Sequence, residues 1–174
     1  MHEIQYTFYP ITKEILPFKI HMAGITYADG NYRIERKKSK FYTLEYIISG
    51  EGTLVENSKE YNPKAGDVYI LHKGCSQTYY SDPKNPWVKM FFNVDGSIIP
   101  PLLSNYCIAN TTYIPQFDIS DLFESFLSEC KLNKQLPYSE IFDRTSLIFH
   151  KMVQEISRHI TKDYNDNLAM AIKT

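Results

Sequence analysis

The 174-residue sequence lacks the features that would place it in a secreted or membrane-bound class. It has only three cysteines, an odd number without CxxC spacing, which excludes a disulfide framework and favours reduced thiols in a cytosol. Its apolar runs are far shorter than the roughly 20 residues of a membrane helix, and its first residues lack the charged and apolar regions of a secretion signal. We therefore expect a cytoplasmic protein with no membrane segment.

The sequence also lacks a charge bias and the common catalytic motifs. Lys plus Arg total 19 and Asp plus Glu total 20, so no overall charge favours nucleic acid or an anionic membrane. There is no P-loop, GxSxG or HExxH motif, and Gly50-Glu51-Gly52 has Val55 where a dinucleotide loop needs its third glycine. The five histidines do not fall at metal-ligand spacing. We expect neither a metal nor a cofactor.

Glycine divides the chain into two parts, because all seven glycines lie between residues 24 and 96. Up to that boundary, short alternating runs separated by turn signals predict about eight strands of an antiparallel sandwich or barrel. Beyond Pro100-Pro101, helical spacing predicts helices over residues 119–132 and 139–164, the second ending at Asn165-Asp166-Asn167. The predicted fold class is mainly β with C-terminal helices.

Two features of the sequence leave alternatives open. Aromatic residues make up 14% of the chain, with 14 Tyr and 10 Phe, which suits either cross-strand packing or an aromatic-lined pocket. The segment from Arg33 to Lys40 is rich in cations. It can be a phosphate-binding patch, a solvated loop, or a solvated loop from which one arginine turns inward to grip a polar ligand.

The order and spacing of three segments carry a family resemblance. Residues 44–52, 66–74 and 87–96 resemble the cupin fold and, more closely, the N-terminal effector-binding domain of AraC-type transcription regulators. The resemblance implies a cupin-like double-stranded β-helix (jelly roll) followed by two antiparallel helices.

The same resemblance implies a division of the chain. Residues 1–96 would form the effector-binding barrel with an N-terminal arm, and Tyr6–Pro10 resembles the part that can close over the pocket. Residues 97–165 would form a helical dimerisation subdomain. Residues 166–174 would begin a linker to a helix-turn-helix DNA-binding domain that is absent from this chain.

The sequence departs from metal-dependent cupins at the metal ligands. Such cupins place two histidines shortly before a glutamate and a third after the second motif. Here Glu45 remains, but Ser39 and Phe41 stand near the first pair and Gln77 stands at the third place. One carboxylate without an imidazole binds a transition metal poorly, which leaves the barrel interior free for a ligand.

Strand alternation groups the candidate ligand contacts. Thr43 and Ile47 share a face with Glu45, and Trp87, Lys89, Phe91 and Asn93 share another. The resemblance places Tyr79, Lys89 and Phe91 where the arabinose-responsive member touches its sugar, and Arg36 nearest to that member's ligand-binding arginine. The predicted ligand-binding residues are Arg36, Thr43, Glu45, Gln77, Tyr79, Trp87, Lys89 and Phe91.

These residue types suit a carbohydrate. Aromatic rings stack on the C–H faces of a sugar, and charged groups bond its hydroxyls. The alternative for Trp87 and Phe91 is the core of the barrel, and the alternative for Glu45 is an ion pair with Lys89 across the sheet.

The resulting hypothesis is the non-catalytic effector-binding and dimerisation domain of an AraC-type transcription activator that senses a sugar or a similar polar molecule. We expect a homodimer in which a stripe on the second helix is divided between the barrel and a partner subunit; the stripe comprises Ile141, Ile148, Met152 and Ile156. The alternatives are a free-standing cupin enzyme acting on a carbohydrate, such as an epimerase or isomerase, and a purely structural dimerisation module.

Overall fold

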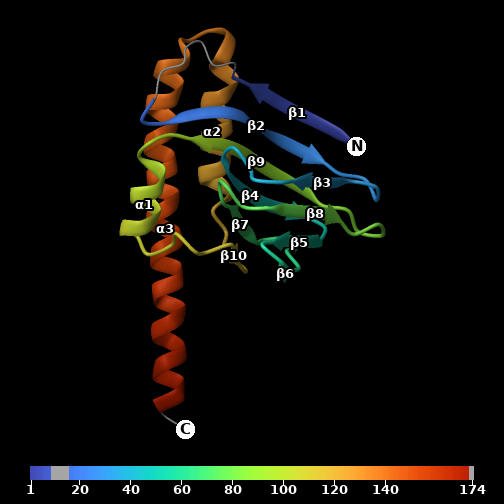
Figure 1. Ribbon diagram of the computed structural model, residues 1–174, viewed down its shortest axis with the longest axis vertical. Coiled ribbons are helices and arrows are strands. Elements are labelled where there is room, and N and C mark those ends of the chain that lie inside the picture. The colour runs from blue at the N-terminus through green and yellow to red at the C-terminus, as the bar shows by residue number, and fades with distance from the viewer. Residues whose placement is uncertain (9–15, 173–174) are drawn as a thin grey trace.

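The computed structural model describes residues 1–8 and 16–172, with side chains as far as residue 164. Two antiparallel sheets face each other, and helices cover the outer face of the larger sheet (Figure 1). The large sheet has the order β1 (His2–Thr7), β2 (Lys19–Tyr27), β9 (Val88–Asp95), β4 (Tyr42–Ser49), β7 (Val68–Leu71) and β10 (Tyr113–Ile114). The small sheet has the order β3 (Arg33–Arg36), β8 (Gln77–Ser81), β5 (Gly52–Glu56) and β6 (Lys59–Tyr61). The predicted cupin-like double-stranded β-helix is confirmed.

The alternation of side chains along the strands produces two separate cores. On β4, Leu44 and Tyr46 pack toward the helices, whereas Ile47 packs between the two sheets. On β9, Phe92 faces the helices and its neighbour Phe91 faces the space between the sheets. The large sheet is therefore a shared wall, with a helix-side core on one face and an interior on the other.

The helices follow β9 in the order α1 (Ile99–Asn105), α2 (Ser120–Cys130), the short 3₁₀ helix η1 (Lys131–Lys134) and α3 (Tyr138–Ile172). The two long helices pack as an antiparallel pair, as predicted (Figure 1). The sequence did not predict α1, because Pro100 and Pro101 marked only a boundary. Both prolines lie in its first turn, where a helix needs no backbone N–H donor.

The predicted end of the last helix was wrong. Helix α3 continues through Asn165-Asp166-Asn167 and reaches Ile172. Asn and Asp are only mildly unfavourable within a helix, and neither Gly nor Pro interrupts this stretch. None of the helices formed by the described residues combines the length and hydropathy that a bilayer span requires.

The helix-side core contains most of the stripe that was expected to serve a dimer. Ile141, Met152 and Ile156 are fully buried there, so their burial is explained within one chain. Ile148 is only half-buried. Of the four predicted dimerisation residues, it is the one left with surface to offer a partner.

The two seams between the sheets differ. At one seam, Tyr61 of β6 contacts Tyr113 of β10, and the Glu56 carboxylate at the end of β5 accepts hydrogen bonds from Thr112 and His72 beside the large sheet. At the other seam, among the described strands, β1 pairs only with β2, and β3 pairs only with β8. The strand ladders therefore leave the interior open between β1 and β3.

Candidate ligand-binding cavity

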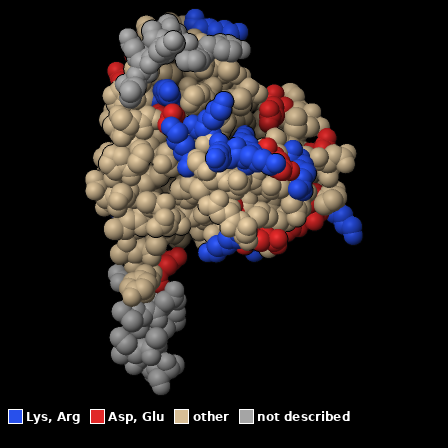
Figure 2. Space-filling view, in the orientation of Figure 1, with Lys and Arg blue, Asp and Glu red and all other residues tan. Residues whose placement is uncertain are grey.

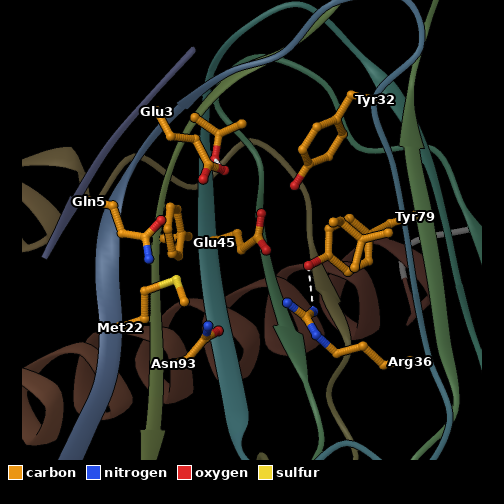
Figure 3. Close-up of a pocket in the computed structure, with 11 residues that line it drawn as sticks. Glu3, Gln5, Met22, Tyr32, Arg36, Glu45, Tyr79 and Asn93 are labelled. Atoms are coloured by element: carbon orange, nitrogen blue, oxygen red, sulfur yellow. Dashed lines mark hydrogen bonds between the residues drawn. The ribbon is translucent and has the colours of Figure 1, made fainter. Parts of the chain in front are cut away.

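A cavity of about 200 Å³ lies between the sheets beside this open seam (Figure 3). Its volume corresponds to about seven water molecules at roughly 30 Å³ each. Strands β1 and β2 form one side and β3 the opposite side, while β4, β8 and β9 supply the rest. The lining residues are Glu3, Gln5, Met22, Thr26, Tyr32, Ile34, Arg36, Glu45, Tyr79, Phe91 and Asn93.

Four of the eight predicted ligand residues line this cavity: Arg36, Glu45, Tyr79 and Phe91. They come from four different strands, and strand alternation turns each of them inward. Thr43 lies directly behind the wall, where its hydroxyl donates a 2.7 Å hydrogen bond to Oδ1 of Asn93. This bond fixes the orientation of an amide that does face the cavity.

Lys89 and Trp87 lie deeper than predicted. The Lys89 ammonium pairs with the Glu45 carboxylate and also lies 3.1 Å from the Tyr69 hydroxyl. It is fully buried and faces several aromatic rings, with centroid distances of 4.4 Å to Tyr79 and 4.8 Å to Trp87. The expected alternative, an ion pair with Glu45 across the sheet, is therefore confirmed. Lys89 holds the carboxylate from behind and does not line the cavity.

Burial controls the ionisation of these groups. It lowers the pKa of Lys89, while the nearby Glu45 carboxylate acts in the opposite direction. Burial also raises the pKa of Tyr69, Tyr79 and Tyr32 well above the ordinary value, and the negative charge of Glu45 adds to that effect. These phenols stay protonated near neutral pH, and Tyr69 donates a 2.5 Å hydrogen bond to Oε2 of Glu45.

Arg36 is the member of the cationic segment that turns inward. Its Nη1 donates a 2.5 Å hydrogen bond to the Tyr79 hydroxyl. Its guanidinium carbon lies 5.4 Å from the ring centroids of both Phe41 and Tyr79. The other cations of the segment, Arg33, Lys37, Lys38 and Lys40, are exposed. The observed arrangement is the third alternative derived from the sequence, a solvated run with one inward arginine.

Gln77 does not reach this cavity. Its side-chain amide donates 2.8 Å to the backbone carbonyl of His72 and lies 3.4 Å from the Glu56 carboxylate. These contacts place it in the polar cluster that closes the opposite seam. Its role in the structure is to connect the two sheets.

Sequence reasoning missed most of the β1 and β2 side of the cavity. The first residues form a paired strand, which places Glu3 and Gln5 in the wall, and Thr26 of β2 donates a 2.8 Å hydrogen bond to Oε1 of Glu3. Alternation along β2 places Met22 and Thr26 on one face and was a signal that could have found these two residues. Tyr6, from the predicted arm, packs against the helix-side core, and Tyr9 and Pro10 lie outside the described residues.

The donor set of the cavity is unsuited to a transition metal. Its charged groups are two carboxylates and one guanidinium, which cannot ligate a cation, and it contains no imidazole or thiol. Over the described ranges of the chain, no group of three or more His, Cys, Asp and Glu side chains could hold a metal ion.

Comparisons with known proteins agree with this architecture. Residues 19–162 match the protein family described as the AraC-like ligand binding domain. The lactose operon transcription activator of Staphylococcus xylosus is 26% identical over 113 residues, which cover 65% of this chain and 39% of that protein. The raffinose operon transcriptional regulatory protein RafR of Pediococcus pentosaceus is 32% identical over 104 residues, which cover 59% of this chain and 37% of that protein.

A similar fold occurs in a solved structure. An apo ToxT variant from Vibrio cholerae superimposes with a TM-score of 0.53 at 14% identity, covering 86% of this chain and 57% of that chain. The chain thus spans less than two fifths of the length of the two curated relatives and just over half of this structural neighbour.

Proposed function

Because the chain belongs to the family of AraC-like ligand-binding domains, we propose that it is the effector-binding and dimerisation part of a transcription regulator. Its effector is a sugar or a similarly polyhydroxylated small molecule. The observation that carries the proposal is the inter-sheet cavity, in which charged groups, amides and three aromatic rings surround a space of single-ring size. Two relatives whose names refer to lactose and raffinose operons support the choice of a sugar.

The wall offers both kinds of contact that a sugar requires. Phe91 and Met22 supply apolar surface for C–H faces. Glu45, Asn93 and Gln5 supply acceptors and donors for hydroxyl groups, and the charged member gives the stronger bond. Because Lys89 and Tyr69 already hold Glu45 in place, little ordering entropy is lost when a ligand binds.

Binding without chemical conversion is the activity that this wall supports. Proton transfer near neutral pH needs a group whose pKa lies near that pH. Burial keeps the pKa of Tyr32 and Tyr79 far above it, and Glu45 is engaged in an ion pair. No feature of the cavity favours the carbohydrate epimerase or isomerase over a binding site.

Effector binding would regulate through a population shift. A ligand that binds one arrangement of β1 and the loops better than another shifts the balance between them, by no more than its difference in affinity. We propose that this shift is passed to a homodimer formed through the helices and to a DNA-binding region outside this chain.

The proposal is tested by calorimetry and thermal unfolding of the 174-residue chain with a panel of monosaccharides and disaccharides. A ligand at 100 times its Kd should add about 2.7 kcal/mol to the free energy of unfolding. Phe91→Ala should abolish that gain, whereas Met90→Ala, on the same strand but facing the helices, should lower stability without changing affinity.

Two results would overturn the proposal. One is the absence of stabilisation by any sugar in the panel. The other is turnover of a sugar by the purified chain, measured by chromatography with and without added Mn²⁺, which would favour the enzyme.

A further inference from the structure

The guanidinium of Arg36 is a partly buried cation without an anionic partner. Among the described residues, no carboxylate lies within ion-pair distance of it. Within the described part of the chain, its side chain donates one hydrogen bond, to the neutral Tyr79 hydroxyl, so most of its five N–H donors have no partner there. Burial opposes its charge, but Tyr79 and the nearby charge of Glu45 outweigh burial and keep the pKa of Arg36 above the ordinary value, so the guanidinium faces the cavity as a cation.

The neighbouring side chains hold Arg36 in position for a ligand. Phe41 and Tyr79 each present a ring to the guanidinium at 5.4 Å, so stacking fixes the plane of the fork. Figure 3 shows the guanidinium at the edge of the cavity beneath Tyr79, pointing inward. A planar fork held in this way suits a carboxylate or a phosphate, which it can bind through two parallel hydrogen bonds.

Each of the two cavity carboxylates has a direct partner other than Arg36, although the charge of Glu45 also acts on Arg36. Glu45 is neutralised by Lys89. Glu3 lies on the opposite side of the cavity from Arg36 and accepts a hydrogen bond from Thr26 (Figure 3). The cavity therefore has a cationic end at β3 and an acceptor-rich end at β1.

The outside of the cationic end adds to the attraction. Arg33, Lys37, Lys38 and Lys40 are exposed on β3 and in the turn that follows it. Figure 2 shows Lys and Arg gathered in a band on the face of the molecule that carries β3. In a chain of net charge −1, such a local excess draws anions toward the opening next to it.

We propose that the natural effector is an anionic sugar derivative, a polyhydroxylated molecule of single-ring size whose carboxylate or phosphate pairs with Arg36. This inference rests on the proposed function and specifies its ligand. The hydroxyl groups of the molecule donate to Glu45 and Glu3, and its apolar face lies on Phe91.

The test is calorimetric titration of the 174-residue chain with matched pairs of ligands. Glucuronate and galacturonate represent carboxylates, glucose 6-phosphate represents phosphates, and glucose and galactose are the neutral counterparts. Inorganic phosphate reports binding of the anion alone. We expect one acid to bind about ten- to a hundredfold more tightly than its neutral sugar, as one charge-assisted interaction implies. The preferred acid distinguishes a carboxylate from a phosphate.

Three variants assign the effect to one side chain. Arg36→Gln should remove the preference for the acid, and Arg36→Lys should retain part of it. Arg33→Gln removes the same charge from the same strand, but its side chain is exposed and packs on the outer Tyr80 ring, so it should change affinity only slightly. Thermal unfolding of each ligand-free variant verifies that it folds.

The outcomes separate this inference from the proposed function. Equal affinity for acid and neutral sugar, unchanged by Arg36→Gln, overturns the anionic effector and leaves sugar sensing intact. Equal losses of affinity for the acid in Arg36→Gln and Arg33→Gln also overturn it. The positive charge would then act by general attraction from the protein surface and not by direct contact with the ligand. Failure of every ligand in the panel overturns both.

Discussion

The ammonium group of Lys89 pairs with the carboxylate of Glu45 inside the barrel, and the two side chains are only 1% and 2% exposed. Tyr69 donates a hydrogen bond to the same carboxylate oxygen. Each charge compensates the other in a place that water does not reach. The pair forms part of the wall of the cavity. Removing one member of the pair should therefore change the free energy of unfolding by a different amount from replacing both members with apolar residues.

Removing one partner of this pair should be more destabilising than removing both. Glu45→Leu or Lys89→Met alone leaves a buried charge without compensation, at a cost of about 3–5 kcal/mol. The double variant leaves no unpaired buried charge, so its loss of stability should be smaller than that of either single variant. Urea denaturation of the four proteins measures this. Additive losses would show that the pair contributes little coupling.

The stability of the chain should fall in acid through Glu56. Burial raises the pKa of Glu56, but the hydrogen bonds from His72 and Thr112 outweigh it and lower the pKa below the ordinary 4.5. Because the folded-state pKa is depressed, the stabilisation is complete above the unfolded pKa and is lost as pH falls through the folded one.

Denaturation midpoints between about pH 6 and pH 3 measure this loss. The wild type should lose stability more steeply below about pH 4.5 than Glu56→Gln. Parallel curves for the two proteins would assign the acid sensitivity to other carboxylates, such as Asp95, whose pKa is also lowered.

Gly52→Ala should displace the single tryptophan. A Cβ at residue 52 would lie 2.2 Å from Cζ3 of Trp87 and 2.4 Å from the carbonyl oxygen of Tyr80. Overpacking of this kind costs about 1–3 kcal/mol, and the fluorescence of Trp87 should change with it. Gly74→Ala is the control, because its Cβ meets nothing within 4 Å and its φ of +87° adds only backbone strain. An unchanged emission spectrum in Gly52→Ala would contradict the prediction.

Ile148→Glu should weaken the proposed dimer. Ile148 is half-buried on α3 and borders a groove lined by Asp121, Glu124 and Glu129 of α2. A negative charge there would repel these carboxylates and a partner's apolar surface, so sedimentation velocity at micromolar concentration should show monomers. Ser146→Glu places the same charge on the opposite flank of the helix and should leave the dimer intact. A monomeric wild type would contradict the dimer itself.

The sequence predicted well what strand geometry dictates. A strand turns alternate residues to opposite faces, so an inward Glu45 implied an inward Ile47 and outward Leu44 and Tyr46, as observed. The inward Arg36 was one of three alternatives, and choosing among them required knowing which strand lay opposite. Alternation does not give depth, which is why Lys89 and Trp87 were expected in a cavity they only support.

The rest of the candidate site could not be predicted from the sequence, because it depends on contacts between distant parts of the chain. Tyr32 and Glu3 reach the cavity because β3 and β1 occupy the two edges of one seam. Nothing local to either residue indicates that position. The polar cluster at Glu56 likewise joins residues from four segments, so only the folded chain shows that Gln77 belongs to it.

The alternation of Phe91 and Phe92 on β9 has a consequence for how such a sensor can diversify. One side chain faces the cavity, and the next packs against Phe126 of α2 at a centroid distance of 4.1 Å. A substitution at the first can retune ligand preference while the aromatic stack behind it stays whole. A displacement of β9 itself would move side chains on the cavity face and on the helix face together. Ligand selectivity can therefore change through single substitutions on the cavity face, whereas a signal to the helices requires movement of the β9 backbone.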